Sequence, residues 1–406
     1  WFPGPRSFTG EDSVELQIHG SYAVVDAILK TLSTVPNCRV ADPGEFSMRA
    51  VLNGRLSLPE AEGLNDLIHA TTAVQRRTAL RQVEGALELE LAAMRDGTLR
   101  ALAIFEAVID FGEDAEIEDE QLAIARADML RVIEMGERLL KDSQRGELVT
   151  TGVHVALVGP VNAGKSSLMN LLAKRPAAIV SATAGTTRDV VQVNLDVAGV
   201  PVVLSDTAGL RGDVVEQDSV HVDDVEREGM RRALDVAATA SVIIVVIDAA
   251  DPNLLQTAET TVAALSRSTP LSEQRQVLVL FNKSDTLSSE TTFSAPSVGG
   301  VHCSDVILGS VNEGQGIDTL LEALSRCVRE RCAAGDTDDI PLVVRRRHAQ
   351  QLQLCVEALR RGVDTQLAEL AAEDLREAVR CFGRITGDVG VETMLDIVFS
   401  EFCVGK

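Results

Sequence analysis

A chain of 406 residues with 45 % hydrophobic content can bury more than one core, and its length predicts about two to four domains. The formal charge of −23 excludes a protein that coats itself in nucleic acid, because phosphate binding needs clustered Lys and Arg. Seven scattered cysteines without a C-x-x-C pair favour a reducing compartment, and no apolar run approaches the roughly 18 residues of a membrane span.

Residues 1–48 predict part of an α+β domain. An alternating stretch at 14–20, "VELQIHG", precedes an apolar helical pattern from Val24 to Leu32. The opening letters, "WFPGPRSFTGED", are typical of the middle of a domain. We therefore expect an N-terminal segment to be missing, together with any targeting peptide.

Residues 49–150 and 333–406 predict helices. Apolar residues recur there at steps of three and four, with little Gly or Pro to interrupt them in the first segment. The repeating sets are Leu64, Leu67 and Ile68; Leu87, Leu91 and Met94; Leu352, Val356 and Leu359; and Val363, Leu367 and Leu370.

Residues 151–332 predict an α/β domain. The runs "VHVALVG", "VPVVLSD", "SVIIVVID" and "QVLVLFN" are nearly continuous in apolar residues, which is typical of a parallel sheet covered on both faces. The sequence thus predicts a multidomain fold with an α/β domain inserted into an all-α helical domain, which is feasible because domain termini often lie close together.

A phosphate-binding loop follows the first of these strands. "GPVNAGKS" at 159–166 matches G-x-x-x-x-G-K-[ST] between a strand and an apolar helix. Its backbone N–H groups would wrap the phosphates, Lys165 would reach the β/γ oxygens, and the Ser166 hydroxyl would bind Mg²⁺. The loop residues predicted to contact the nucleotide are Asn162, Ala163, Gly164, Lys165, Ser166 and Ser167.

Three further motifs lie at strand ends, and one of them, "NKSD", identifies the base as guanine. Asp285 in "NKSD" can accept hydrogen bonds from guanine N1–H and the 2-amino group, which adenine lacks. Asp206 in "DTAG" can hold the magnesium shell, and Ser310 in "GSV" can close over the base. The predicted contacts from these motifs are Asp206, Thr207, Ala208, Gly209, Asn282, Lys283, Asp285 and Ser310. Together the motifs predict a P-loop GTPase and disfavour a metabolic kinase.

The group that orients the attacking water must come from outside "DTAG", since Leu210 follows it where many small GTPases carry glutamine. Asn162 and the oxygen-rich segment 181–189, "SATAGTTRD", form a donor set suited to a monovalent cation, which would offset charge near the β/γ bridge. The alternative is that Asn162 is an ordinary loop residue.

The whole chain resembles the MnmE (TrmE) family of potassium-dependent tRNA-modifying GTPases. The resemblance is carried by "WFPGPRSFTGED", "DPGEFSMRAVLNGRLSL", "AEGLNDLIHATT", "VIDFGED", "RITGDVG" and the terminal "FCVGK". The forms "DFGED" and "FCVGK" are closer to the mitochondrial animal-type member than to bacterial ones, so the resemblance implies the mitochondrial matrix, with the bacterial cytoplasm as the alternative.

The family implies an organisation and a set of partners. Its domains correspond to a partial folate-binding and dimerisation domain at 1–48, helical segments at 49–150 and 333–406, and the GTPase domain at 151–332. It implies a homodimer and an FAD-containing partner of the MnmG (GidA) type. With that partner it would build an aminomethyl-type group, in mitochondria a taurinomethyl-type group, at C5 of the tRNA wobble uridine. The tRNA would be contacted mainly with the partner, and no membrane is involved.

The family also implies roles for individual residues. The potassium loop corresponds to Asn162, Ser181, Thr183 and Thr186, and magnesium to Ser166 and Thr187. Ser181, Thr186 and Thr187 would also contact the nucleotide, and Lys165 would take part in catalysis. A one-carbon tetrahydrofolate, in the 5-formyl or methylene form, corresponds to Glu15, Arg55 and Lys406. Arg55 stands where the family usually has Lys, and an "RISG"-like N-terminal motif of the family is absent from this sequence.

Two glutamates compete for the water-orienting role that the family implies. Glu226 precedes the "EG-x-RR" helix pattern of the family, whereas Glu216 lies in the extra length of the switch segment. We favour Glu226.

The terminal "EFCVGK" carries a thiol beside the last lysine. Leu395, Val398 and Phe402 lie at helical spacing and predict a packed helix end. The resemblance places Cys403 near the one-carbon chemistry as a nucleophile or redox participant, with an inert buried cysteine as the alternative. A nucleotide-switch scaffold without chemistry of its own is the competing function, and it would have no use for this thiol.

Overall fold

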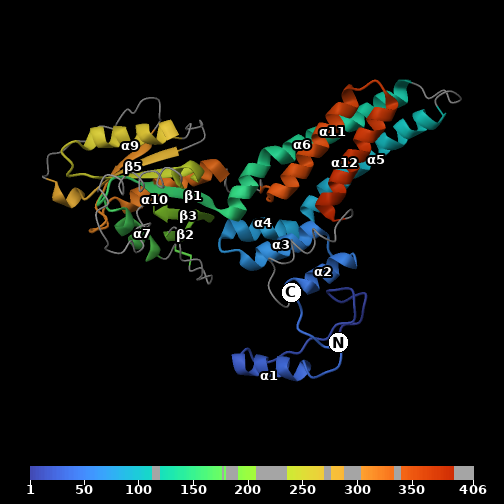
Figure 1. Ribbon diagram of the computed structural model, residues 1–406, viewed down its shortest axis with the longest axis horizontal. Helices are drawn as coiled ribbons and strands as arrows, with labels where there is room; N and C mark the ends of the chain where they lie inside the picture. Colours follow the sequence, from blue (N-terminus) through green and yellow to red (C-terminus); the bar gives the residue numbers. More distant parts are fainter. Residues whose placement is uncertain are drawn as a thin grey trace, which may run out of the picture. The chain divides into compact units, whose positions relative to one another are not determined.

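The computed structural model describes residues 1–111, 119–175, 178–179, 191–206, 236–268, 276–287, 303–332 and 340–387 (Figure 1). The chain forms two compact units. The helical unit takes 1–70, 76–146 and the chain from 341 onward, and the sheet unit takes 71–75 and 147–340. The helical unit is thus discontinuous in sequence, and residues 1–48 do not separate from it.

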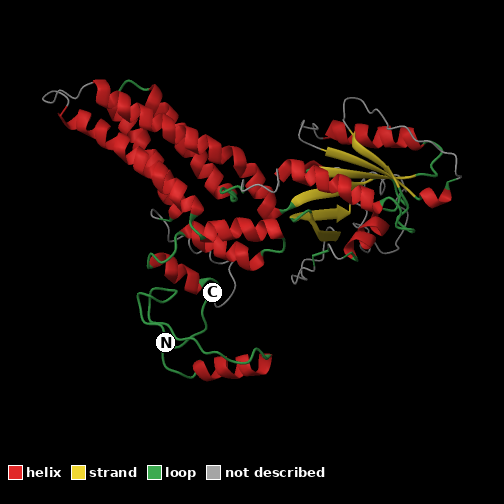
Figure 2. Cartoon of the chain, turned by 180° about the vertical axis from the view of Figure 1, so that it is seen from behind, coloured by secondary structure: helices red, strands yellow, loops and turns green. Residues whose placement is uncertain are grey.

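Helices make up the regular structure of the helical unit in the described residues (Figure 2). They are α1 (Tyr22–Leu32), α2 (Glu45–Leu52), α3 (Leu58–His69), α4 (Ala73–Val83), α5 (Ala86–Phe111), α6 (Asp119–Thr151), α11 (Arg346–Asp364) and α12 (Ala368–Thr386). Residues 71–75 and 147–151, at the start of α4 and the end of α6, belong to the sheet unit.

The core of the helical unit lies among α5, α6, α11 and α12. Leu87, Leu91 and Met94 on α5 are buried there, as their spacing predicts. Figures 1 and 2 both show these long helices side by side. The core therefore joins residues from both sequence segments of the unit.

The predicted continuation of the helical pattern through Leu367 and Leu370 is wrong. The chain leaves the helix at Asp364 and begins a new one at Ala368, and Leu367 and Leu370 are 59 % and 54 % exposed. The Leu367 N–H donates to Thr365 Oγ1 at 3.3 Å, so a local side-chain bond competes with the helix at this point.

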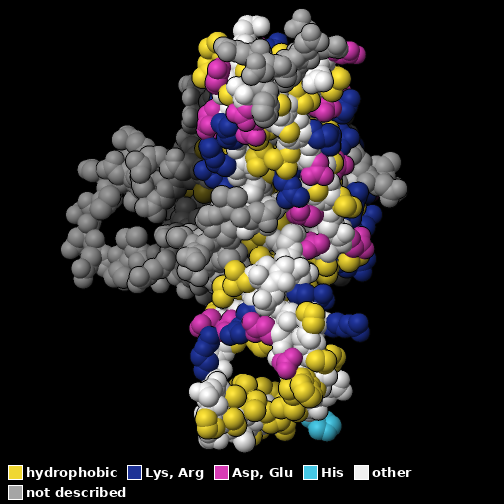
Figure 3. Space-filling model, turned by 90° about the vertical axis from the view of Figure 1, so that its right-hand side faces the viewer, with side chains coloured by type: hydrophobic (Ala, Val, Ile, Leu, Met, Phe, Trp, Pro, Cys, Tyr) yellow, Lys and Arg dark blue, Asp and Glu magenta, His cyan; other side chains and the backbone are white. Residues whose placement is uncertain are grey.

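The alternating stretch at 14–20 forms no strand, and within the described residues an isolated bridge joins Phe2 to Ser13 at its border. The predicted helix is present as α1, with Ser21 Oγ accepting from Val24 N at its N-terminus. None of the residues of α1 is buried, and apolar side chains gather over the N-terminal segment at the bottom of Figure 3.

The sheet unit has six strands in the order β2-β3-β1-β4-β5-β6 among the described residues. They are β1 (Val153–Val158), β2 (Val191–Val197), β3 (Val200–Asp206), β4 (Val242–Asp248), β5 (Gln276–Asn282) and β6 (Cys303–Leu308). All neighbours pair in parallel except β2, which pairs with β3 in antiparallel fashion. The four predicted strands are β1, β3, β4 and β5, and a mostly parallel sheet is confirmed.

Helices cover both faces of this sheet. On one face α7 (Lys165–Ala173) and α10 (Ile317–Cys332) pack on apolar residues of β1, β3 and β4, and on the other face α9 (Leu254–Ser268) packs on β4 and β5 (Figure 1). Burial on both faces explains the nearly continuous apolar runs. The carboxyl ends of the parallel strands meet along one edge, where parallel α/β folds bind ligands. No helix of the described residues is long and apolar enough to cross a bilayer.

Candidate nucleotide-binding site

The phosphate-binding loop lies between β1 and α7, and two glycines are required by its geometry. Gly159 has φ 152°, and a Cβ there would lie 2.0 Å from the Val246 carbonyl oxygen. Gly164 has φ 102°, and a Cβ there would lie 2.1 Å from Asn282 Nδ2. Both distances are too short for any side chain, so the loop depends on glycine at these positions.

Lys165 begins α7 with a side chain that is 5 % exposed. Its Nζ donates to the carbonyl oxygens of Gly159 and Pro160 at 2.8 and 2.7 Å. The ammonium is therefore held over the loop that would wrap the phosphates, at a helix N-terminus that favours anions.

Ser166 and Asp206 meet beside this loop. Ser166 Oγ donates to Asp206 Oδ2 at 2.7 Å, and Asp206 ends β3 with only 1 % exposure. The contact forms because β1 and β3 are parallel neighbours, with Leu157 in register with Asp206. A hydroxyl and a carboxylate oxygen are hard donors of the kind that Mg²⁺ prefers, so this pair fits a magnesium ion.

Asn282, at the end of β5, connects the phosphate loop to the loop after β6. Its Nδ2 donates to the Ala163 carbonyl at 2.8 Å, and its Oδ1 accepts from Val311 N at 3.0 Å. The side chain is 2 % exposed, so both bonds are shielded from water. The carboxamide therefore fixes two loops that are far apart in sequence.

The predicted base-recognition residues lie around Asn282. Asp285 is exposed in the short 3₁₀ helix Ser284–Thr286, and its carboxylate accepts no hydrogen bond within the described part of the chain. Ser310 is fully buried, with its N–H donating to Gln315 O at 3.0 Å and its Oγ accepting from Glu313 N at 3.3 Å. Asp285 is thus available to a ligand, while Ser310 shapes its loop.

Asp248 is a neighbour of this site that sequence reasoning missed. It ends β4, and Lys283 Nζ donates to its Oδ2 at 2.6 Å. Burial raises the pKa of Asp248, but the hydrogen bonds from Lys283 and from the Ala250 N–H outweigh this and lower the pKa. The available signal was a carboxylate directly after an apolar strand in "SVIIVVID".

Two family models match the chain. One, described as "MnmE helical domain", matches residues 58–403, and the other, "GTP-binding protein TrmE N-terminus", matches residues 1–55. The chain belongs to the MnmE family. The predicted family and the predicted enzyme class, a GTPase, are therefore confirmed.

Relatives of this MnmE-family chain match it from end to end. A human protein named "5-taurinomethyluridine-[tRNA] synthase subunit GTPB3, mitochondrial" is 44 % identical over 410 residues, covering 100 % of this chain and 80 % of the relative. "tRNA modification GTPase MnmE" from Paramagnetospirillum magneticum is 43 % identical over 407 residues, covering 100 % of this chain and 86 % of the relative.

Solved structures match less closely. A crystal structure of a GTP-binding protein from the archaeon Sulfolobus solfataricus in complex with GDP is 14 % identical, covers 58 % of this chain and 67 % of its own, and has a TM-score of 0.30. The family assignment of the MnmE-family chain rests on the sequence matches.

Many of the residues predicted from the motifs, from helical spacing or from the MnmE resemblance lie outside the described residues. These are Ser181, Thr183, Thr186, Thr187, Thr207, Ala208, Gly209, Glu216, Glu226, Cys403 and Lys406, and with them the tail positions Leu395, Val398 and Phe402. Of the remaining loop residues, Ala163 is buried, Ser167 is exposed on α7, and Asn162 is exposed with φ 65°.

Glu15 and Arg55, the described members of the folate set implied by the MnmE family, are both exposed. The chain around Arg55 is close to residues 1–13: a Cβ on Gly10 would lie 3.2 Å from Arg55 Cγ, and Asn53 Nδ2 donates to Thr9 O at 2.8 Å. At the other end of the unit, a Cβ on Gly387 would lie 3.2 Å from Leu58 Cβ. The last described residue before the C-terminal tail is thus close to the segment that carries Arg55.

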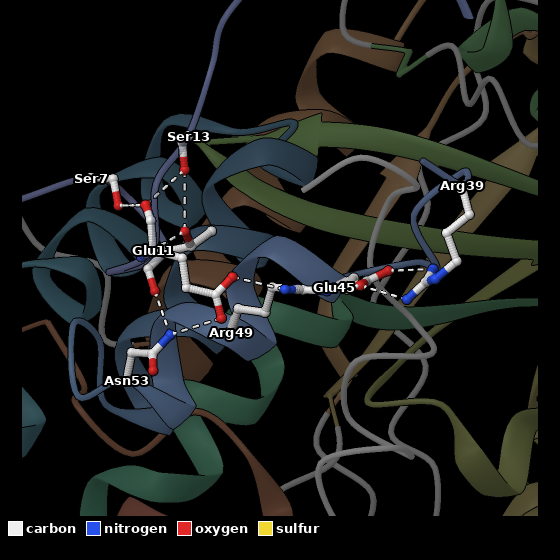
Figure 4. Close-up of polar contacts among 8 residues, drawn as sticks. Ser7, Glu11, Ser13, Arg39, Glu45, Arg49 and Asn53 are labelled. Atoms are coloured by element: carbon white, nitrogen blue, oxygen red, sulfur yellow. Dashed lines mark hydrogen bonds and ion pairs between the residues drawn. The ribbon is translucent and has the colours of Figure 1, made fainter. Parts of the chain in front are cut away.

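A charge network fastens this region (Figure 4). Glu45 accepts from Arg39 at 2.7 Å and from Arg49 at 2.7 Å, and Arg49 also donates to Glu11 at 2.8 Å. The hydrogen bonds to Glu45 from Arg49, from the Asp42 N–H and from Arg39 hold its pKa at about 2. The network ties residues 1–13 and the 39–44 loop to α2, close to the chain around Arg55.

Proposed function

We propose that this GTPase acts in the modification of the wobble uridine of tRNA. The observation that carries the GTP-dependent part is the Ser166–Asp206 contact at 2.7 Å, formed beside Lys165 at the carboxyl edge of the parallel strands. The tRNA-directed part rests on family membership, because the similar human and bacterial proteins bear names of tRNA modification.

Magnesium would be held by Ser166, with Asp206 in its shell and Thr187 as a further proposed donor. The ion would neutralise charge on the phosphates when bound. Lys165, whose Nζ already contacts the carbonyl oxygens of the loop, would bind the β/γ oxygens of the nucleotide. Asp285 would accept hydrogen bonds from N1–H and the 2-amino group of guanine. The proposed nucleotide contacts remain those predicted from the four motifs.

Hydrolysis would depend on Glu226 as the water-orienting residue, with Glu216 as the weaker candidate. Potassium would bind Asn162 together with Ser181, Thr183 and Thr186. The side chain of Asn162 is exposed on the phosphate-binding loop, where its amide oxygen could contact a potassium ion, and this supports its place among the ligands.

The organisation of the chain supports a modification enzyme of several domains. We assign 1–48 to a partial folate-binding and dimerisation domain, 49–150 and 333–406 to a helical domain, and 151–332 to a GTPase domain inserted in it. The exposed apolar side chains of residues 1–40 would pack against a second copy in a homodimer.

The chemistry on tRNA would need further groups. Glu15, Arg55 and Lys406 would bind a one-carbon tetrahydrofolate, and Cys403 would take part in the one-carbon step. An FAD-containing partner of the MnmG type would complete the reaction. The group installed at C5 would be of the aminomethyl type, or of the taurinomethyl type if the protein works in the mitochondrial matrix. The name of the human relative includes both "5-taurinomethyluridine" and "mitochondrial".

One experiment tests the GTPase part of the proposal. Hydrolysis of GTP is measured in K⁺ and in Na⁺ at equal ionic strength, with and without Mg²⁺. We expect Mg²⁺-dependent turnover that is faster in K⁺, and loss of turnover in Ser166→Ala. Equal rates in the two salts would remove the potassium assignment. Full activity of Ser166→Ala would contradict the magnesium assignment. The control is Thr260→Ala, which removes an exposed hydroxyl on α9 and should leave turnover unchanged.

A second experiment tests the tRNA part. Cells that lack their own family member are given this chain, and the wobble nucleoside is measured by mass spectrometry. Restoration of the modified nucleoside is expected. Restored growth with an unmodified wobble uridine would favour the scaffold function instead.

A further inference from the structure

The ion pair between Asp248 and Lys283 lies at the border of the base-recognition motif. Asp248 and Asn282 are in register at the ends of the parallel strands β4 and β5, so the next residue, Lys283, leaves the sheet beside Asp248. Lys283 Nζ lies 2.6 Å from Asp248 Oδ2, and each side chain is 33 % exposed. The pair is therefore partly shielded from water, which strengthens it relative to a surface pair.

Asp248 is itself held in place by its own turn. Its second oxygen, Oδ1, accepts from Ala250 N at 3.0 Å, and Asp251 N donates to its carbonyl at 3.1 Å. The Ala249 N–H donates to the Asn282 carbonyl at 2.7 Å, which joins this turn to the end of β5. The carboxylate is thus a fixed point against which Lys283 can be oriented.

Lys283 needs such a fixed point because its backbone is unusual. Its φ is 65°, in the left-handed region that L-residues other than glycine rarely adopt. Around it, the Ser284 N–H donates to Gly309 O at 3.1 Å and the Thr286 N–H to Lys283 O at 3.1 Å. This turn determines where the exposed carboxylate of Asp285 points.

We propose that Asp248 is a positioning residue for guanine-nucleotide binding: it holds the Lys283 side chain and, through it, the turn that presents Asp285 to the base. The proposal rests on the proposed function, since it assumes that Asp285 binds guanine. It predicts that Asp248 affects nucleotide affinity and base discrimination, and that it leaves the turnover of bound GTP unchanged.

The test compares Asp248→Asn with a matched control in the full chain. The asparagine keeps an oxygen for the Ala250 N–H but removes the charge that holds Lys283. The control is Asp251→Asn, an acid of the same turn that caps α9 through Asn253 N at 2.8 Å and Thr257 Oγ1 at 2.8 Å. Affinity for a fluorescent GDP analogue and the kcat and KM for GTP are measured for each.

We expect Asp248→Asn to weaken GDP binding by about three- to tenfold, with a matching rise in KM and an unchanged kcat, while Asp251→Asn binds as the wild type does. Asp248→Glu, which keeps the charge, should recover most of the affinity. Discrimination of GDP against inosine diphosphate, which lacks the 2-amino group, should also fall in Asp248→Asn.

A double-mutant cycle separates positioning from a general loss of stability. If Asp248 acts through Lys283, adding Asp248→Asn to Lys283→Met should cost no further affinity, whereas a general loss of folding would make the two effects additive. Wild-type affinity in Asp248→Asn, or additive effects in the cycle, would overturn the proposal. Failure of the wild-type chain to bind GDP would instead count against the proposed function.

Discussion

His348 Nε2 lies 2.8 Å from Glu62 Oε2, and both side chains are 2 % exposed, which joins the start of α11 to α3 inside the helical unit. Arg347 Nη2 lies 3.0 Å from the other oxygen of Glu62, and its Nη1 donates to the Arg384 carbonyl in the last turn of α12 at 2.7 Å. Burial raises the pKa of Glu62, but the contact with His348 and the nearby guanidinium groups lower it to about 2. The buried carboxylate of Glu62 thus takes part in a set of contacts that connects α3, α11 and α12.

Replacement of Glu62 should therefore destabilise the helical unit strongly. Glu62→Gln leaves the half-buried guanidinium groups of Arg345 and Arg347 without their counter-charge and leaves His348 beside an uncharged amide, and we expect a loss of about 1–3 kcal/mol in the free energy of unfolding. Urea unfolding followed by circular dichroism measures this. Glu137→Gln, which breaks an exposed pair with Arg360, serves as control and should change stability by less than about 1 kcal/mol. Equal losses in the two variants would show that burial of the Glu62 cluster has no special cost.

Stability should also fall on mild acidification because of His348. Burial lowers the pKa of this imidazole below its usual 6.5, although Glu62 opposes the shift. The unfolded chain therefore binds the proton first, and stability is lost as the pH falls below about 6.5. The contribution of Glu62, whose folded pKa is depressed from 4.5, is lost only as the pH falls below about 4.5 towards 2.

Thermal melting between pH 7.5 and 5.5 tests this dependence on His348. His348→Gln should flatten the decline of the melting temperature over that range. His69→Gln, at an exposed histidine on α3, should leave the decline as in the wild type. A decline of unchanged slope in His348→Gln would assign the pH dependence to other groups.

Gly164→Ala should abolish nucleotide binding. The added Cβ would lie 2.1 Å from Asn282 Nδ2 in a backbone conformation with φ 102°, so the bond from Asn282 to the phosphate loop cannot survive. Gly314→Ala is a matched control, since Gly314 also has a positive φ, of 74°, but faces open space. Binding of a fluorescent GDP analogue distinguishes them: we expect no saturation for Gly164→Ala and near wild-type affinity for Gly314→Ala.

Substitution of the two candidate glutamates of the switch segment should affect GTP turnover differently. Glu226→Ala should reduce GTP turnover by about 10²-fold or more while GTP binding is retained, because only the positioning of the attacking water is lost. Glu216→Ala should hydrolyse GTP at nearly the wild-type rate. Single-turnover kinetics with both variants decides the matter, and a reversed pattern would transfer the role to Glu216.

Cys403→Ser should separate the two activities of the chain. If the thiol takes part in the one-carbon step, the variant loses wobble-uridine modification in cells and keeps its GTPase rate in vitro. Cys38→Ser, at an exposed cysteine of the N-terminal segment, is the control. Normal modification by Cys403→Ser would make the terminal cysteine inert.

The nucleotide site was the most predictable part of the protein. Its motifs follow strands with nearly continuous apolar runs, and parallel strands bring their carboxyl ends to one edge, so Ser166 and Asp206 were both expected near the phosphates. Their direct contact depends on the pairing of β1 with β3, which the order of the strands in the sequence does not give. Asn282 was predicted as a contact of the nucleotide, but its role in joining two loops depends on distances that no spacing gives.

Features that depend on distant partners could not be predicted. Glu62 and His348 are polar residues within amphipathic helical patterns, and they form a buried pair only because α3 and α11 are brought together in the folded unit. Asp248 was overlooked because its partner Lys283 follows the end of the neighbouring strand β5, 35 residues further along the chain. The break near Thr365 was missed because the apolar spacing continues across it, although the side chains of Leu367 and Leu370 turn out to face solvent.

The two ends of "NKSD" differ in how freely they could evolve. The carboxylate of Asp285 is exposed and accepts no hydrogen bond within the described residues, so under the proposed guanine binding a change there would alter the preferred base and leave the bonds of the phosphate loop intact. Asn282 is bonded to both Ala163 and Val311, so a substitution there would break the hydrogen bonds that connect the phosphate-binding loop to the loop after β6. Under the proposed function, related proteins could change their preferred purine by substitution at Asp285. Substitution at Asn282 would instead weaken the connection between the two loops, and with it the binding of any nucleotide.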